Sequence, residues 1–217
     1  MQQDERSSKE RILKLVRKGL LQKDVTFPAN LDWESDVFAR GELNGAELFA
    51  ESFTFNKGQF VFCYNQYHFI DQFLSAAEQR GWESVSCIEK HLMHLFNECD
   101  FPLLSDANDV LLADAGITGC DALIARTGSI ILSSLGNKSR TISVFPPVHI
   151  VVAYRNQVVY DLKQYLNTFS SPDASLPSMM SIVSGPSRTS DIEKTLVMGA
   201  HGPKEMFVFY VDEDKPE

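Results

Sequence analysis

The sequence predicts an α/β fold built around a mostly parallel sheet. Two observations support this prediction: short continuous apolar runs of strand length alternate with segments of helical period, and the runs lack the polar alternation of a half-exposed strand. Residues 60–64 form one such run, and residues 69–77 follow with apolar side chains at helical spacing. This alternation is typical of βαβ units, in which both faces of the sheet are covered.

The first half of the chain supplies the helices and the first strands. Residues 7–23 carry one apolar stripe at helical spacing among Lys and Arg, and residues 24–45 lack a clean period and predict an arm. We therefore assign residues 1–45 to an N-terminal helix and arm and residues 46–217 to an α/β domain. Within that domain we expect the 69–77 helix to end at Gly81, strands at 85–88 and 110–113, and a helix at 92–96.

The second half predicts either a β-rich insertion or an antiparallel extension of the sheet. Short apolar runs joined by tight turns indicate strands at 122–125, 129–132, 142–145, 148–154 and 157–160. We then expect a helix at 161–169, a serine-rich loop at 170–190 containing a strand at 182–183, a short helix at 191–198 and a final buried strand at 206–211.

Composition excludes several classes of protein. The chain has 217 residues, is 44% hydrophobic and carries a net charge of −9, which argues against nucleic acid or an anionic membrane as the main partner. No apolar run is long enough to span a membrane, and the polar, acidic start predicts no signal peptide, so we expect a cytoplasmic protein. Four cysteines without a C-x-x-C pair favour buried thiols in a reducing compartment: Cys63, Cys87, Cys99 and Cys120.

The motif over residues 184–193 contains a glycine turn followed by a capping-box pattern, Ser190 with Glu193. A strand, a glycine turn and a helix N-terminus form a ready anion site, which Arg188 would strengthen. The contact residues would be Ser187, Arg188, Thr189 and Asp191. The alternative is structural, because Asp191 and Glu193 already place negative charge in the first helical turn.

A second glycine-rich loop follows at residues 199–203. His201 lies there between two glycines, where it can transfer a proton or contact a carboxylate, and Gly202 would line the same site. The alternative is an ordinary exposed turn histidine.

Three further stretches carry candidate ligand contacts. Arg126, Thr127, Gly128 and Ser129 can cradle an anion or simply form a β-turn that needs Gly128 at positive φ. Residues 114–119 indicate a glycine turn in which Asp114 and Thr118 face a crevice, and His149 either points into a cleft or is satisfied in the core. His91, His94 and Glu98 have metal-binding spacing on a helix, but nothing else completes such a site, so we expect no metal.

Five stretches together resemble the LUD domain, the family of lactate-utilization protein C. They occur in the family's order within residues 58–212, at 113–119, 124–129, 145–150, 184–193 and 199–203. The resemblance implies a three-layer α/β/α fold similar to the sugar-isomerase and CoA-transferase-like group. It also implies a role in oxidising L-lactate to pyruvate with two partner proteins that carry iron–sulfur clusters, while this chain binds no cofactor itself.

The sequence departs from the family pattern at one position. Arg126 stands where the resemblance leads us to expect the glutamate of Glu-Thr-Gly-Thr. An arginine cannot act as a carboxylate nucleophile or base, although it can bind a carboxylate or phosphate.

Three functions remain open on the sequence: an accessory subunit of a lactate-oxidising system, a free-standing isomerase- or transferase-like enzyme, or a non-catalytic interaction module. We favour the first and expect the loops at 114–119, 126–129, 187–191 and 201–203 to converge at the strand ends.

Overall fold

The computed structural model describes residues 8–21, 43–106, 109–135, 141–170, 175–189, 197–199 and 201–216. The chain divides into two units, residues 1–42 and residues 43–217. In the first unit, the expected helix is present as α1 (Ser8–Leu21), and its large apolar side chains are exposed. The expected arm at 24–45 lies largely outside the described residues. None of the described helices is long and apolar enough to cross a membrane.

A six-stranded sheet forms the centre of the second unit, and every strand pair in it is parallel. Its order is β1 (Gln59–Cys63), β12 (Glu205–Val211), β7 (Val148–Tyr154), β4 (Ala115–Gly119), β2 (Val85–Ser86) and β3 (Leu103–Leu104). All seven residues of β7 and six of the seven in β12 are buried, as their continuous apolar sequence requires. The predicted mostly parallel α/β fold is therefore confirmed.

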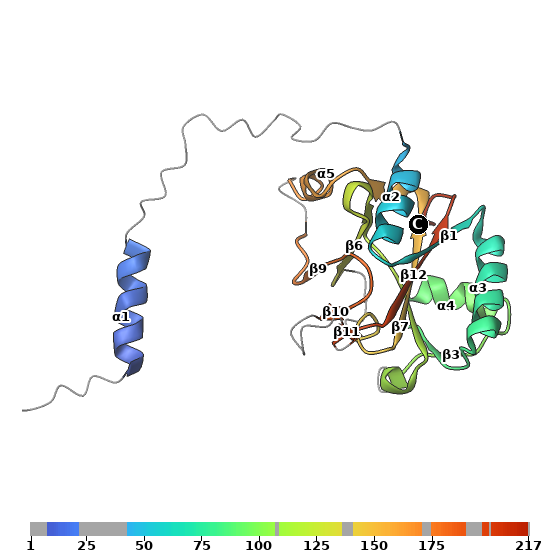
Figure 1. Cartoon of the computed structure of the whole chain (residues 1–217), viewed down its shortest axis with the longest axis horizontal. Coiled ribbons are helices and arrows are strands. Elements are labelled where there is room, and N and C mark those ends of the chain that lie inside the picture. Colours follow the sequence, from blue (N-terminus) through green and yellow to red (C-terminus); the bar gives the residue numbers. More distant parts are fainter. Residues whose placement is uncertain are drawn as a thin grey trace, which may run out of the picture. The chain divides into compact units, whose positions relative to one another are not determined.

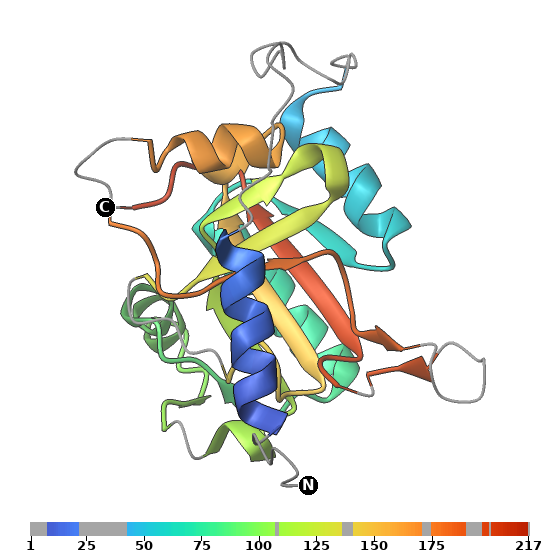
Figure 2. The same ribbon diagram turned by 90° about the vertical axis from the view of Figure 1, so that its left-hand side faces the viewer.

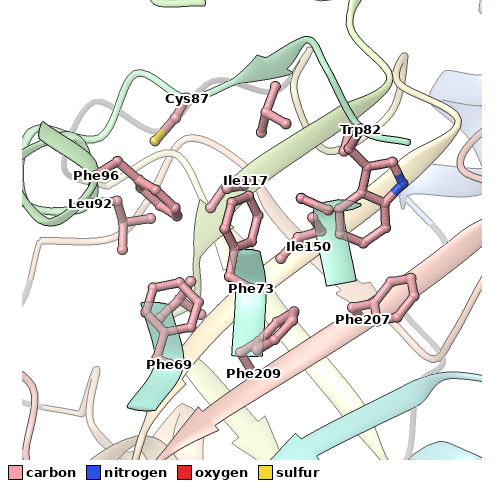
Figure 3. Close-up of a cluster of buried hydrophobic side chains, with 14 of the residues drawn as sticks. Phe69, Phe73, Trp82, Cys87, Leu92, Phe96, Ile117, Ile150, Phe207 and Phe209 are labelled. Carbon is pink, nitrogen blue, oxygen red and sulfur yellow. The ribbon is translucent and has the colours of Figure 1, made fainter. Parts of the chain in front are cut away.

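Helices α3 (Gln66–Arg80) and α4 (Lys90–Asn97) cover one face of this sheet (Figure 1). Their aromatic side chains gather around Phe73, whose ring lies 4.7 Å from that of Phe96, edge to face (Figure 3 shows the cluster). Phe101, which follows α4, adds a further edge-to-face contact with Phe73 at 5.1 Å. Each fully buried ring of this size contributes about 1.5–3 kcal/mol by leaving water. The aromatic cluster therefore fixes both helices to the sheet.

The opposite face is covered by α2 (Gly45–Phe55) together with a second sheet. That sheet has the order β8 (Val158–Val159), β5 (Ala122–Ile124), β6 (Ser129–Ser133) and β9 (Met180–Val183). It is separate from the central sheet, so the β-rich region is an insertion and not an extension of the central sheet. The strand expected at 148–154 in that region is instead β7 of the central sheet, where both its neighbours are parallel. Helix α5 (Leu162–Asn167) packs on its outer side through Tyr165. The sequence prediction missed α2, although Asn44 and Glu47 have the spacing of the capping box that starts it.

Three predicted elements around β4 and β7 are wrong. The strand expected at 110–113 is a 3₁₀ turn over residues 109–112, with Leu111 and Leu112 exposed. The glycine turn expected at 114–119 is instead occupied by the buried strand β4. Gly116 serves close packing here, because a Cβ there would lie 2.5 Å from the carbonyl oxygen of Ile142. The strand expected at 142–145 is a turn that lies over Gly116. Strand β7 starts only after Pro146 and Pro147, because proline has no N–H to donate to a neighbouring strand.

The last two residues of the helix expected at 191–198 form a strand instead. Val197 and Met198 form β11 and pair antiparallel with β10 (Arg188–Thr189), giving a hairpin that projects from the body in Figure 2. The sequence at both positions, Thr189 and Val197, is β-branched, a residue type that favours strand over helix. The expected capping box, Ser190 with Glu193, and the candidate Asp191 lie outside the described residues.

The packing at Gly116 predicts a stability effect. We expect Gly116→Ala to lower the free energy of unfolding by about 1–3 kcal/mol, because the added methyl group meets backbone that cannot yield freely. Urea denaturation measures this loss. Gly19→Ala is the matched control, because nothing lies within 4 Å of a Cβ at Gly19. Equal stability of wild type and Gly116→Ala would contradict the close approach.

Candidate functional site

The turn at residues 126–129 packs directly on the last turn of α2. Gly128 has φ 59°, and a Cβ there would lie 2.4 Å from the backbone nitrogen of Phe53. The side-chain amide of Asn56, which follows α2, donates to the carbonyl oxygen of Thr127 at 3.0 Å. Gly185 reaches the same place from the other motif, because a Cβ on it would lie 2.5 Å from the Asn56 carbonyl oxygen. Two motifs 55 or more residues apart therefore meet at the end of α2.

A chain of three hydroxyl groups joins these two motifs. The Thr127 Oγ1 and Ser129 Oγ atoms are 2.7 Å apart, and Ser129 Oγ is 2.7 Å from Ser184 Oγ. Ser129 is buried, whereas Thr127 and Ser184 are exposed. Either atom of each pair can donate, so the chain can turn a donor or an acceptor outward. Asn56 and Ser184 are candidate site residues that the sequence did not single out, although Ser184 and Gly185 open the 184–193 motif.

The hollow beside this turn has a volume of about 550 Å³, and its lining includes Arg126, Thr127, Asn56 and Glu51. A separate hollow of about 690 Å³ lies elsewhere in the domain. Arg126 is half-buried in the hollow beside the turn. Both the carboxylate of Glu51 and the carbonyl end of α2 make the surroundings negative. Arg126 is therefore the cationic group of the hollow, and any anion bound in it depends on that guanidinium.

The loop with Ser187 and the loop with His201 and Gly202 are also neighbours. The Ser187 N–H donates to the Pro203 carbonyl at 2.9 Å, and a Cβ on Gly202 would lie 3.2 Å from Ser187 Cβ. His201 and Arg188 are both exposed; of Thr189 the structure describes only the backbone, in β10.

These loops lie at the amino ends of the parallel strands. Pro203 and Lys204 directly precede β12, and the Lys204 N–H donates to the Pro147 carbonyl, just before β7, at 2.7 Å. Asn56 likewise precedes β1. Open α/β sheets usually bind ligands at the carboxyl ends of their strands, and we expected these loops there. The structure places them instead at the amino ends. The reason is topological: a chain that leaves a strand at its carboxyl end must return to the amino end before it enters the next parallel strand.

Asp114 is used within the fold. Its carboxylate accepts hydrogen bonds from the N–H groups of Glu83 and Ser84, at 3.1 and 2.9 Å, and from the Ser84 hydroxyl at 2.9 Å. These bonds, led by that from the Ser84 backbone, lower the pKa of Asp114 because they favour the charged form. Asp114 thus fastens the segment before β2 to the start of β4 and is not brought to the Arg126 hollow.

Thr118 and His149 form a buried pair on neighbouring strands. Thr118 Oγ1 lies 2.8 Å from His149 Nε2, and His149 is 1% exposed. Its Nδ1 has no hydrogen-bond partner among the described residues. Burial lowers the pKa of His149 to about 4, because desolvation penalises the imidazolium. His149 is therefore neutral at pH 7, and its environment is the core rather than an open cleft.

The candidate metal ligands do not form a site. His94 Nδ1 lies 3.6 Å from Glu98 Oε1 on the exposed side of α4, and the part of the chain that the structure describes contains no group of three or more His, Cys, Asp or Glu residues arranged for a metal ion. Three cysteines are buried, Cys99 is partly buried, and none of the four forms a disulfide, which agrees with the expected buried thiols. Burial raises the pKa of both Cys63 and Cys87 to about 12, so neither thiol is a nucleophile at neutral pH.

One buried carboxylate was not considered in the sequence analysis. Glu89, 6% exposed, precedes α4 and accepts a 2.9 Å hydrogen bond from the Gly119 N–H at the carboxyl end of β4. A Cβ on Gly119 would lie 3.0 Å from Glu89 Oε2, so the glycine makes room for the carboxylate. The only sequence signal was an acidic residue immediately after a short strand.

The buried histidine predicts a pH dependence of stability. Between pH 6.5 and 4 the unfolded chain binds a proton at residue 149 that the folded chain does not, so stability falls as the pH falls through this window. From pH 7 to pH 5 this one group removes about 2 kcal/mol of unfolding free energy. We expect His149→Gln to lose less stability than wild type over that interval in urea unfolding. The exposed His94→Gln is the control, and identical pH slopes for wild type and His149→Gln would refute the assignment.

Comparison with known sequences relates part of the chain to a known domain family. The model of the LUD domain family matches residues 105–211. Lactate utilization protein C 1 of Bacillus mycoides is 36% identical over 104 residues, which are 46% of this chain and 44% of that protein. Lactate utilization protein C of Halalkalibacterium halodurans is 37% identical over 94 residues, 42% of this chain and 41% of that protein. An uncharacterized protein of Neisseria meningitidis serogroup B is 34% identical over 98 residues, 45% and 42% of the two chains.

The chain spans less than half the length of these curated relatives. A solved structure, that of a DUF162 family protein from Deinococcus radiodurans, superposes with a TM-score of 0.55 at 18% identity and covers 78% of this chain and 99% of that one. This similarity shows that the two share a fold. The five sequence motifs all lie within this matched segment, so residues 105–211 of the chain match the LUD domain family both in the family model and in the order of their motifs.

Proposed function

We propose that this chain is an accessory component of a cytoplasmic system that oxidises L-lactate to pyruvate, and that it works with partner proteins that carry iron–sulfur clusters. The observation that supports this proposal is the match of the LUD domain to residues 105–211, together with relatives named lactate utilization protein C. Lactate oxidation releases two electrons, which an iron–sulfur partner would accept.

We further propose that the Arg126 hollow binds a small carboxylate or phosphate. Arginine presents a planar fork of N–H donors that matches both anions. The hydroxyl groups of Thr127, Ser129 and Ser184 stand next to it in a connected chain and can supply additional hydrogen bonds. Gly128 holds the turn against α2, which keeps these groups in place.

An arginine at position 126 also excludes two catalytic roles for this residue. A guanidinium stays protonated at neutral pH, so it cannot serve as nucleophile or general base. Its role is to bind and orient. Other candidates belong to neighbouring segments at the amino ends of the strands: Ser187, Arg188, Thr189, His201 and Gly202. Arg188 would supply a second cation to the same anion. His201 would donate a hydrogen bond or a proton to it.

The anion site predicts a selective binding defect. We expect Arg126→Ala to weaken binding of L-lactate, pyruvate or inorganic phosphate by roughly tenfold or more, because a hydrogen bond to a charged group contributes about 1.5–3 kcal/mol. Isothermal titration of the full chain with each anion measures this loss. Lys90→Ala, which removes an exposed cation at the start of α4, is the matched control. Unchanged anion binding by Arg126→Ala would refute the site and leave the metabolic role standing.

The metabolic role predicts a growth phenotype. We expect deletion of the gene in its native host to abolish growth on L-lactate and to leave growth on pyruvate unchanged, because only the oxidation step is lost. The wild-type gene should restore growth, and affinity purification of the tagged chain from lactate-grown cells should retain iron and acid-labile sulfide. Normal growth of the deletion strain on L-lactate would refute this role.

A further inference from the structure

A second cavity lies at the opposite end of α2 from the Arg126 hollow. It has a volume of about 690 Å³, within the range of small-molecule sites. Its walls come from the first turns of α2, from the ends of β1 and β12, and from the segment that follows β7. None of the motifs that mark the LUD domain contributes a residue to it.

The cavity occupies the position where open α/β sheets bind ligands. Phe62, Tyr210 and Arg155 lie at the carboxyl ends of β1, β12 and β7, respectively. The connection after β1 runs through α3 on one face of the sheet, whereas the connection after β7 runs through the second sheet on the other face. Where connections leave to opposite faces, a crevice opens outside the strand ends, and this is the usual ligand position in such sheets.

Aromatic rings form one wall of the cavity. The rings of Phe60 and Tyr210 are stacked with centroids 5.9 Å apart and an interplanar angle of 28°, and those of Phe62 and Tyr210 are 5.8 Å apart at 32°. Phe62 is still 42% exposed. The ring of Tyr64 meets Phe62 nearly perpendicularly, with the two centroids 5.2 Å apart. Offset stacking is favourable for such rings, so the exposed part of Phe62 offers a place for another flat ring.

The rim of the cavity is acidic. The guanidinium of Arg155 lies 3.8 Å from Asp212 and 3.4 Å from Asp214, so two carboxylates already surround it. Glu47 adds a further carboxylate at the start of α2, where it accepts a hydrogen bond from the Asn44 N–H at 3.3 Å. An anionic group on a ligand would face net negative charge, whereas a neutral ring with hydrogen-bond donors would not.

We propose that this cavity is a second binding site, which takes a neutral planar heteroaromatic ring and disfavours its phosphorylated form. The ring stacks on the wall made by Phe60, Phe62 and Tyr210, and its polar edge meets the carboxylates of Glu47 and Asp212. The site is independent of the Arg126 hollow, since the two lie at opposite ends of α2.

Riboflavin and adenosine are the probes, and FMN and AMP are their phosphorylated partners. We expect the full chain to bind at least one neutral probe with a dissociation constant below about 1 mM, measured by fluorescence for riboflavin and by titration calorimetry for adenosine. We expect the phosphorylated partner to bind about fivefold more weakly, and Glu47→Gln to reduce that difference. Failure of both neutral probes to bind would overturn the proposal, and equal binding of each pair would overturn its charge selectivity.

Two substitutions locate the binding. Ala50→Trp fills the cavity from α2 and should abolish binding, and Phe62→Ala removes a partly exposed ring and should weaken binding about tenfold. Tyr67→Ala, which removes a 79% exposed ring on α3 outside the cavity, is the matched control. Arg126→Ala should leave riboflavin and adenosine binding unchanged, which separates this site from the anion site. If Phe62→Ala and a folded Ala50→Trp bind the probes as wild type does, the cavity is not the site.

Discussion

The structure depends on the pairing of β7 with β12, which runs parallel over seven residues in the middle of the six-stranded sheet. Both strands are apolar on both faces, so neither face of the sheet can be left to water. The aromatic side chains of α3 and α4 cover one face of the sheet. Helix α2 and the second sheet together cover the other face. The layers on either side of the sheet thus follow from the sequence of these two strands.

Helix α2 links that packing to both proposed sites. Its buried side chains, Phe49 and Phe53, hold it on the sheet, while its two ends lie beside different cavities. At its carboxyl end, two glycines allow the 126–129 turn and the 184–187 segment to approach its backbone closely. At its amino end, the capping box at Asn44 and Glu47 sets one rim of the aromatic cavity. A helix that the sequence analysis overlooked is therefore the element that positions both sites.

Some parts of this molecule could be predicted from the sequence, and others could not, for physical reasons. Strands such as 148–154 and 206–211 are evident because burial on both faces makes their sequences almost continuously apolar, with His149 as the polar exception. Gly116 and Gly119 were misleading, since a glycine that makes room for Ile142 or Glu89 looks the same in sequence as one that forms a turn. The meeting of Thr127, Ser129 and Ser184 was also hidden, because 55 residues separate Ser129 from Ser184. The location of the 199–203 loop was predictable, since a loop that directly precedes a parallel strand must lie at its amino end.

The strand order has a kinetic consequence. Strand β12 is inserted between β1 and β7, and paired groups such as Gln59 and Glu205 are 146 residues apart in sequence. Until β12 arrives, β1 has no partner strand and β7 presents an open, apolar edge. Contacts of such long range slow folding, and open edges invite pairing with other chains. An intermediate that lacks β12 is therefore the state in which the strand edges of this protein are most exposed to aggregation.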